Sequence, residues 1–170
     1  WAGDPSTGNE IISMLRSEDP DIICLQEYYR SRWEPYTSDS LLRALDMTPY
    51  HHIEYSINNR DKKYGLAIFS HYTIVGTGKV DLGESLSLCA WADILVGEDT
   101  LRIYNMHLQS IRLSSRHYRM IDSLRFRYDD RQMKEIRDLS TRLRDAFIKR
   151  ADQADRIASH MAGSPYPIIA

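Results

Sequence analysis

Short runs of strand-forming residues follow one another through the middle of the chain. They lie at 50–55, 64–69, 73–80, 86–96 and 101–108. Turn-forming residues separate them, most clearly in Asn58-Asn59-Arg60-Asp61 and Gly97-Glu98-Asp99. Short connections of this kind join antiparallel strands, whereas parallel strands need a long crossover. The pattern therefore predicts antiparallel pairing here and argues against a simple doubly wound parallel sheet.

Helix and strand patterns flank this region. The spacing of apolar residues in 11–15 predicts a helix, and the apolar run 22–25 that follows is typical of a buried strand. The leucines in 41–45 predict a second helix, and the run 166–170 predicts a last strand. This order of elements predicts an α/β fold in which two mixed β-sheets pack as a sandwich with helices outside.

The segment 112–162 has a different pattern, that of a long amphipathic helix of about 26 residues or more. Gly163 and Pro165 follow it as stop signals. The expected apolar stripe consists of Ile136, Leu139, Leu143, Phe147, Ala151, Ala154, Ala158 and Met161. Such a stripe is typical of a helix face that docks on a sheet, and a partner-binding or coiled-coil seam is the alternative.

The composition restricts the class of protein further. A length of 170 residues suits one domain, and a net charge of −2 argues against a strongly basic nucleic-acid binder. No apolar run is long enough to span a bilayer. Residues 112–160 carry 13 Lys and Arg against 8 Asp and Glu. This basic stretch would either attract a polyanion or pair its charges along a solvated helix face.

Common nucleotide, zinc and nucleophile motifs are absent, among them GxxxxGK[ST], GxGxxG, HExxH, CxxC and GxSxG. Polar residues at strand ends therefore become the candidates for chemistry. The first is Glu27, which closes the strand Leu25-Gln26-Glu27. One or two carboxylates at such a position suit Mg²⁺, which keeps several of its waters. A helix cap or a salt-bridged residue at the rim is the structural alternative.

The second candidate is Asn105-Met106-His107-Leu108, at the end of the run 101–108. By strand alternation His107 faces away from Met106 and Leu108. A histidine in this position is either a structural residue or a catalytic one. The third feature is the strand that begins at Gly65 and closes in Ser70, where the glycine allows a close approach of another backbone.

In this order the Leu25-Gln26-Glu27 element, the Gly65-to-Ser70 strand and the Asn105-Met106-His107-Leu108 element resemble the endonuclease/exonuclease/phosphatase superfamily. That group includes deoxyribonucleases, apurinic endonucleases, neutral sphingomyelinases, inositol polyphosphate 5-phosphatases and deadenylases. The resemblance implies a four-layer sandwich, with 1–170 forming a single partial domain and 112–162 a long helical insertion. It also implies a metal-dependent phosphodiesterase or phosphatase that activates water for attack on phosphorus.

The resemblance assigns expected roles to four residues. Glu27 would be the ligand of Mg²⁺ or Mn²⁺, and His107 would contact the phosphate. Asn105, from the same motif as His107, would be a further catalytic residue, and Glu54 would be the carboxylate that orients this histidine. A metal ion beside a protonated imidazole is a chemically consistent arrangement, since both stabilise charge that develops on phosphoryl oxygens.

The resemblance also implies that the site is incomplete in this sequence. The family's metal-site asparagine would precede Trp1, and its GDxN motif and later Asp-His pair would follow Ala170. We therefore expect these 170 residues alone to be inactive. The location of the protein is not predicted, because sequence outside these residues could tether it to a membrane or direct its export. The expected substrate is a phosphoester: a small molecule, a lipid headgroup or a nucleic acid. The alternative is a non-catalytic module that uses 112–160 to bind a membrane surface or a protein partner.

Overall fold

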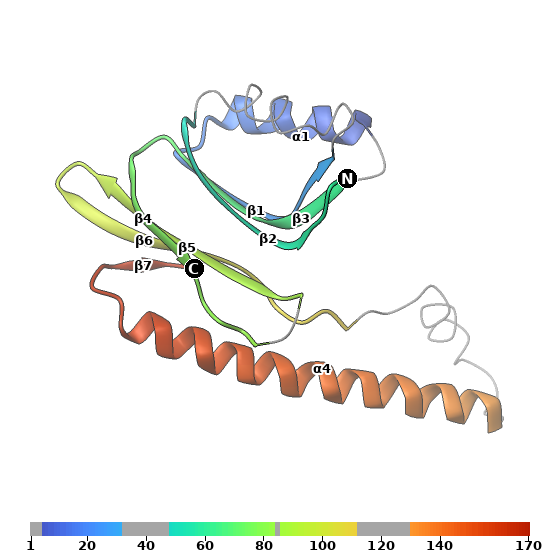
Figure 1. Ribbon diagram of the computed structural model, residues 1–170. Helices are drawn as coiled ribbons and strands as arrows, with labels where there is room; N and C mark the ends of the chain where they lie inside the picture. Colours follow the sequence, from blue (N-terminus) through green and yellow to red (C-terminus); the bar gives the residue numbers. More distant parts are fainter. Residues whose placement is uncertain (1–4, 32–47, 84–85, 112–129) are drawn as a thin grey trace. The chain divides into compact units, whose positions relative to one another are not determined.

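The computed structural model describes residues 5–31, 48–83, 86–111 and 130–170 (Figure 1). The predicted helix at 41–45 lies outside these residues. The chain divides into two compact units, one of residues 1–107 with 156–170 and the other of residues 108–155. None of the helices in the described part is long and apolar enough to cross a membrane.

Within the described residues, sheet A has three antiparallel strands in the order β1-β3-β2. Their bounds are β1 Ile22–Ser31, β2 Tyr50–Asn58 and β3 Lys62–Ser70. The central strand β3 is buried from Gly65 to Ser70 because both of its faces are covered. On one face Ala67 and Phe69 pack with Ile12 and Leu15 of helix α1, which runs from Pro5 to Glu18.

Sheet B is mixed, with the order β4-β5-β6-β7. Its strands are β4 Ile74–Lys79, β5 Leu88–Val96, β6 Asp99–His107 and β7 Ile168–Ile169. β4, β5 and β6 pair in an antiparallel manner, and β7 is parallel to β6. The two sheets meet in one buried apolar cluster, formed by Leu66, Ile68, Ala90, Ala92, Ile94 and Ile103.

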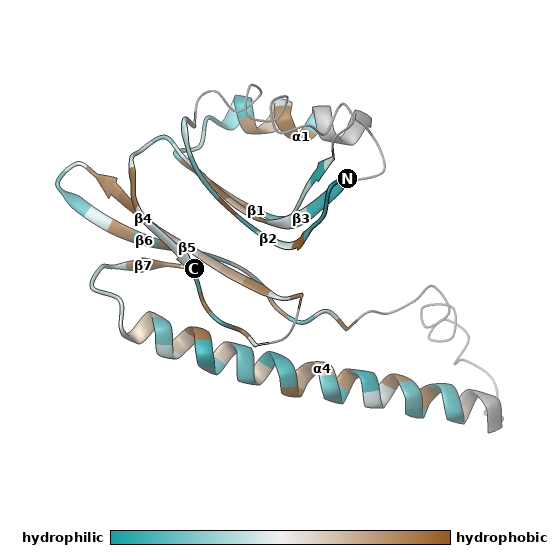
Figure 2. Cartoon of the chain, in the orientation of Figure 1, coloured by the Kyte–Doolittle hydropathy of each residue, from teal (hydrophilic) through white to brown (hydrophobic). Residues whose placement is uncertain are grey.

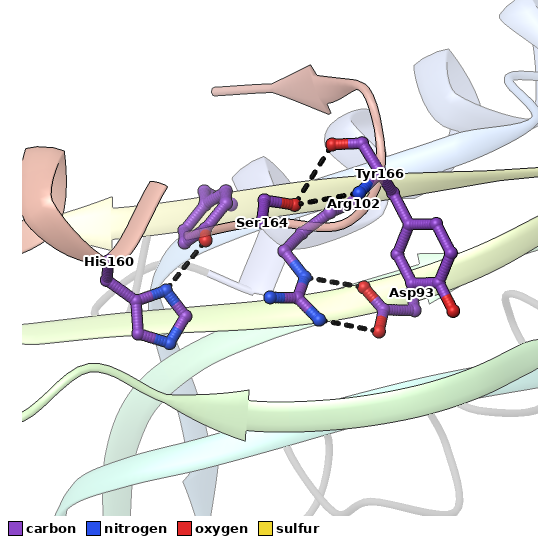
Figure 3. Close-up of polar contacts among 6 residues, drawn as sticks. Asp93, Arg102, His160, Ser164 and Tyr166 are labelled. Atoms are coloured by element: carbon purple, nitrogen blue, oxygen red, sulfur yellow. Dashed lines mark hydrogen bonds and ion pairs between the residues drawn. The ribbon is translucent and has the colours of Figure 1, made fainter. Parts of the chain in front are cut away.

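The outer face of sheet B holds the end of the chain (Figure 3). Arg102 donates two hydrogen bonds to Asp93, at 2.6 and 2.8 Å, and its guanidinium lies 4.1 Å from the ring centre of Trp91. Its backbone N–H donates to the carbonyl of Pro167, next to β7. On the same face the Tyr104 hydroxyl lies 2.7 Å from Nδ1 of His160. These contacts fix β7 and the last turn of the long helix on the sheet.

The long helix, α4, runs from Asp130 to Ala162, so the predicted helix is confirmed from residue 130 onward, and residues 112–129 lie outside the described part. Figure 2 shows α4 as largely hydrophilic, with separate apolar bands. Its predicted stripe is partly wrong. Phe147 is 58% exposed, and the buried positions nearby are Ala146 and Gln153. The burial of Gln153 is compensated by a hydrogen bond that its Oε1 accepts from the backbone N–H of Gln109, a contact that apolar periodicity cannot reveal.

The predicted fold class is confirmed. The elements lie in successive layers. Helix α1 packs on sheet A through Ile12 and Leu15, and sheet A packs on sheet B through the shared apolar cluster. The last turn of α4 contacts the other face of sheet B through His160. Each predicted strand between residues 50 and 108 is present, and both predicted hairpin connections lie between consecutive strands.

Candidate active site

Glu27 lies on a β-bulge in β1, which is an edge strand in the described part of sheet A. The register with β3 shifts between Leu25, which faces Ala67, and Tyr28, which faces Gly65, so β1 contains one extra residue there. Glu27 has a φ of 52°, in the left-handed region that residues other than glycine adopt rarely. Bulges of this kind turn a side chain out of the regular alternation of a strand. The side chain of Glu27 is exposed, so its carboxylate is accessible.

Asn105 of β6 joins sheet B to this bulge. It is 1% exposed, and its Nδ2 donates to the carbonyls of Leu25 and Ala67, each at 3.0 Å. Its Oδ1 accepts a hydrogen bond of 3.3 Å from Nε2 of Gln26. The structure therefore brings the Leu25-Gln26-Glu27 and Asn105-Met106-His107 elements together, although they lie about 80 residues apart in the chain.

His107 is the last residue of β6, opposite Leu88 of β5. Because β6 alternates regularly, His107 shares a face with Asn105 and Ile103, the face that packs towards sheet A. Its side chain is partly exposed. Glu27 and His107 thus lie on either side of the same contact between the sheets. Glu27 is two positions after Leu25 in β1, and His107 is two positions after Asn105 in β6.

Glu54 has a different environment from the one expected. Its carboxylate lies 3.6 Å from Nε2 of His52 and 3.7 Å from Nζ of Lys79. Within the described ranges it makes no hydrogen bond or ion pair with His107. The expected role of Glu54 in orienting His107 stays a prediction, which these contacts do not support.

His52 and Gln26 are two polar residues that sequence reasoning missed. His52 and Glu54 are two residues apart on β2, so strand alternation places them on one face, and this signal was present in the sequence. Gln26 belongs to the quoted Leu25-Gln26-Glu27 element, but its partner Asn105 is too distant in the chain for any local pattern to reveal.

We expect the stability of the protein to fall below pH 6.5 because of His52. Burial lowers the pKa of His52 from 6.5, and Glu54 offsets part of that change. Between 6.5 and the lowered pKa the unfolded chain binds more protons than the folded one, so the unfolding free energy decreases as pH falls. Urea unfolding at several pH values should show a weaker decrease for His52→Gln than for the wild type. An identical decrease in both proteins would contradict this assignment.

The donor set around Glu27 fits a hard divalent cation. An exposed carboxylate on a bulge offers oxygen ligands and leaves room for bound waters, which Mg²⁺ retains in most protein sites. In the described part of the chain, no group of three or more His, Cys, Asp or Glu side chains is arranged to hold a metal. From these residues, a metal at this position would therefore take Glu27 as its protein ligand, with water in the other positions.

The chain is similar to several solved structures. An endonuclease/exonuclease/phosphatase from Beutenbergia cavernae is 18% identical, with a TM-score of 0.50, over 68% of this chain and 36% of that protein. A family protein from Leptotrichia buccalis is 14% identical, with a TM-score of 0.48, over 75% and 60%. Sphingomyelinase C from Streptomyces griseocarneus is 17% identical, with a TM-score of 0.47, over 71% and 52%. The chain thus spans less than two thirds of each of these proteins.

Sequence comparison agrees with the fold. No curated protein sequence matches the chain. The model of the Endonuclease/Exonuclease/phosphatase family, in contrast, matches residues 2–160. This match covers both sheets up to β6, the contact between Asn105 and the Glu27 bulge, and most of α4. The chain belongs to the endonuclease/exonuclease/phosphatase family.

Proposed function

We propose that this chain contributes the residues Glu27 and His107 to a Mg²⁺-dependent phosphoester hydrolase. The observation that carries the proposal is the environment of Glu27. Its carboxylate is exposed, and its backbone has a left-handed conformation on a bulge. Asn105 joins this bulge to β6, the strand that contains His107. A backbone in a sparsely populated conformation persists only where its surroundings stabilise it, and such residues concentrate at functional sites. Membership of the family supports the same reaction class.

In this proposal each residue has a distinct task. Glu27 would hold the metal, and bound Mg²⁺ would neutralise negative charge on the phosphoryl oxygens. His107, at the partly exposed end of β6, would donate a hydrogen bond or a proton to one of those oxygens. The buried contact of Asn105 keeps the two strands together, so that both groups act on one phosphate.

The charge of the chain bears on the substrate. Outside residues 112–160 it carries 9 Lys and Arg against 16 Asp and Glu. An excess of acidic residues disfavours binding of duplex DNA, whose phosphates are closely spaced and negatively charged. We therefore propose a small phosphoester or a lipid headgroup as the substrate, ahead of duplex nucleic acid.

Removal of divalent metal is expected to abolish hydrolysis. The full-length gene product should cleave bis-p-nitrophenyl phosphate with Mg²⁺, lose this activity in EDTA, and recover it when Mg²⁺ or Mn²⁺ is restored. The release of p-nitrophenolate, followed by absorbance, measures the rate. Hydrolysis that persists in EDTA would contradict the metal role.

A complete lack of hydrolysis would favour the alternative of a non-catalytic binding module. The observation that supports this alternative is on α4, where Phe147 and Ile148 are 58% and 62% exposed. The basic residues Lys149 and Arg150 follow them directly. Exposed apolar side chains beside basic ones are typical of helices that bind a partner or an anionic surface.

A further inference from the structure

We propose that Asn105 is a positioning residue that holds the Glu27 bulge in shape through its side-chain amide, with Gln26 as its partner. The proposal rests on the proposed function, in which Glu27 binds the metal. It concerns how the strained conformation of Glu27 is maintained, and it assigns to Asn105 a task other than contact with the substrate.

The hydrogen bonds of Asn105 reach both strands of one β1–β3 residue pair in sheet A. Leu25 and Ala67 are paired residues on β1 and β3, and they form the last regular pair before the register shifts. The Nδ2 group of Asn105 donates to the carbonyls of both, each at 3.0 Å. One amide from sheet B therefore fixes both strands immediately before the bulge that contains Glu27.

The remaining atom of the amide acts on the bulge itself. Oδ1 of Asn105 accepts a hydrogen bond from Gln26, the residue directly before Glu27. In the described structure β1 is an edge strand, which pairs only with β3. Contacts from Asn105, which reaches this pair of strands from sheet B, thus add to the pairing with β3 and stabilise the bulge in β1.

The number of N–H donors in the Asn105 side chain distinguishes a positioning role from direct contact with the substrate. An asparagine amide has two N–H donors, and in Asn105 both are used by backbone carbonyls. The side chain is 1% exposed, so no donor is left for a phosphate in solution. Asn105 therefore acts on the reaction through Glu27, whereas His107, two residues further along β6, is partly exposed and accessible.

The test compares variants of the full-length protein by two measurements that do not depend on catalysis. Isothermal titration with Mn²⁺ measures metal affinity, and amide hydrogen exchange measures protection of residues 26–28. For Asn105→Ala we expect the Mn²⁺ dissociation constant to rise by about 10- to 100-fold, as for other residues that orient a metal ligand, and exchange at 26–28 to accelerate. Asn105→Asp, which keeps the shape but loses both donors, should have at least as large an effect.

Two further variants keep the test decisive if Asn105 variants fold poorly. Gln26→Ala changes an exposed residue, so we expect a folded protein with a smaller rise in the same dissociation constant. Ile103→Ala removes an apolar side chain from the same face of β6, in the cluster between the sheets. This matched control should lower the melting temperature but leave Mn²⁺ affinity and exchange at 26–28 unchanged.

The outcomes distinguish this inference from the proposed function. If Asn105→Ala binds Mn²⁺ as the wild type does, or if Ile103→Ala weakens binding equally, the positioning role is overturned. If Glu27→Ala binds Mn²⁺ normally, the proposed function fails instead. Loss of binding in Glu27→Ala together with unchanged binding in Asn105→Ala and Gln26→Ala would refute the inference alone.

Discussion

Replacement of Glu27 by glutamine is expected to lower the kcat of Mg²⁺-dependent phosphoester hydrolysis by about 100-fold or more. Glutamine keeps the length and shape of the side chain on the bulge but removes its negative charge. A metal that stabilises the transition state contributes several kcal/mol, and each 1.4 kcal/mol corresponds to about tenfold in rate. Rates should be measured at increasing Mg²⁺, since a weakened site will also need more metal for half-maximal activity.

A second substitution at the same position separates activity from stability. Glycine adopts a positive φ without the steric cost of a side chain, which is about 1 to 2 kcal/mol in the left-handed region. We therefore expect Glu27→Gly to lose activity while its free energy of unfolding stays at or somewhat above that of the wild type. This opposite behaviour would show that the sequence keeps a carboxylate at position 27 at the expense of stability, for the chemistry.

The matched control is Glu98→Gln. Glu98 is an exposed carboxylate in the turn between β5 and β6, and its loss should leave both rate and stability unchanged. If Glu27→Gln keeps the full rate, Glu27 is not a metal ligand, and the structural alternative of a rim residue becomes the better interpretation. If Glu98→Gln loses as much activity as Glu27→Gln, the effect is one of overall charge.

The strands of this fold were predictable because their signals are local. Hairpin turns at 58–61 and 97–99 and the alternation between them determine which segments pair, and the structure has these strands within a few residues of the predicted bounds. The conformation of Glu27 was not predictable. The sequence Leu25-Gln26-Glu27 contains no glycine to mark a positive φ, and the bulge depends on a contact with Asn105 from the other sheet.

Burial was predicted less well than secondary structure. Cys24 lies in the run 22–25, which is typical of a buried strand, yet its side chain is exposed, whereas Ile23 next to it is buried. Cys89, on the inner strand β5, is buried. An apolar run in the sequence does not show which of its side chains the packing covers, so the two cysteines could not be distinguished from their neighbours in sequence.

Glu54 shows the same limit for the candidate site. Resemblance to the family placed its carboxylate behind His107, but its contacts in the structure are His52 and Lys79. His52 was recognisable from strand alternation, whereas Lys79 comes from β4, in the other sheet. Contacts between sheets depend on how two surfaces pack, and no periodicity in either strand encodes them.

Replacement of Gly65 by alanine is expected to reduce the free energy of unfolding by about 3 kcal/mol or more. The sequence predicts a close backbone approach at this residue, and the structure confirms it. A Cβ on Gly65 would lie 1.9 Å from the carbonyl oxygen of Glu54 and 2.9 Å from the Cα of Tyr55. Both atoms belong to the backbone of β2, so the clash cannot be relieved by a side-chain rotation, and β2 must separate from β3.

The control for this substitution is Gly163→Ala, after the end of α4. There the added Cβ would lie 3.6 Å from the carbonyl of His160, an ordinary contact, so we expect a change within about 0.5 kcal/mol. Urea unfolding of both variants measures the difference. Equal stability of Gly65→Ala and Gly163→Ala would mean that β2 and β3 are not as close as the structure places them.

The effect of Gly65→Ala should also extend to the candidate site. Gly65 faces Tyr28, the first residue of β1 paired again after the bulge, and Tyr55, the last residue of β2 before its own register shift. One glycine thus lies opposite both irregularities of sheet A. A displacement of β3 at this residue would alter the bulge of Glu27 as well as the pairing of β2, so Mn²⁺ affinity should fall together with stability in Gly65→Ala. In Ile103→Ala, by contrast, only stability should fall.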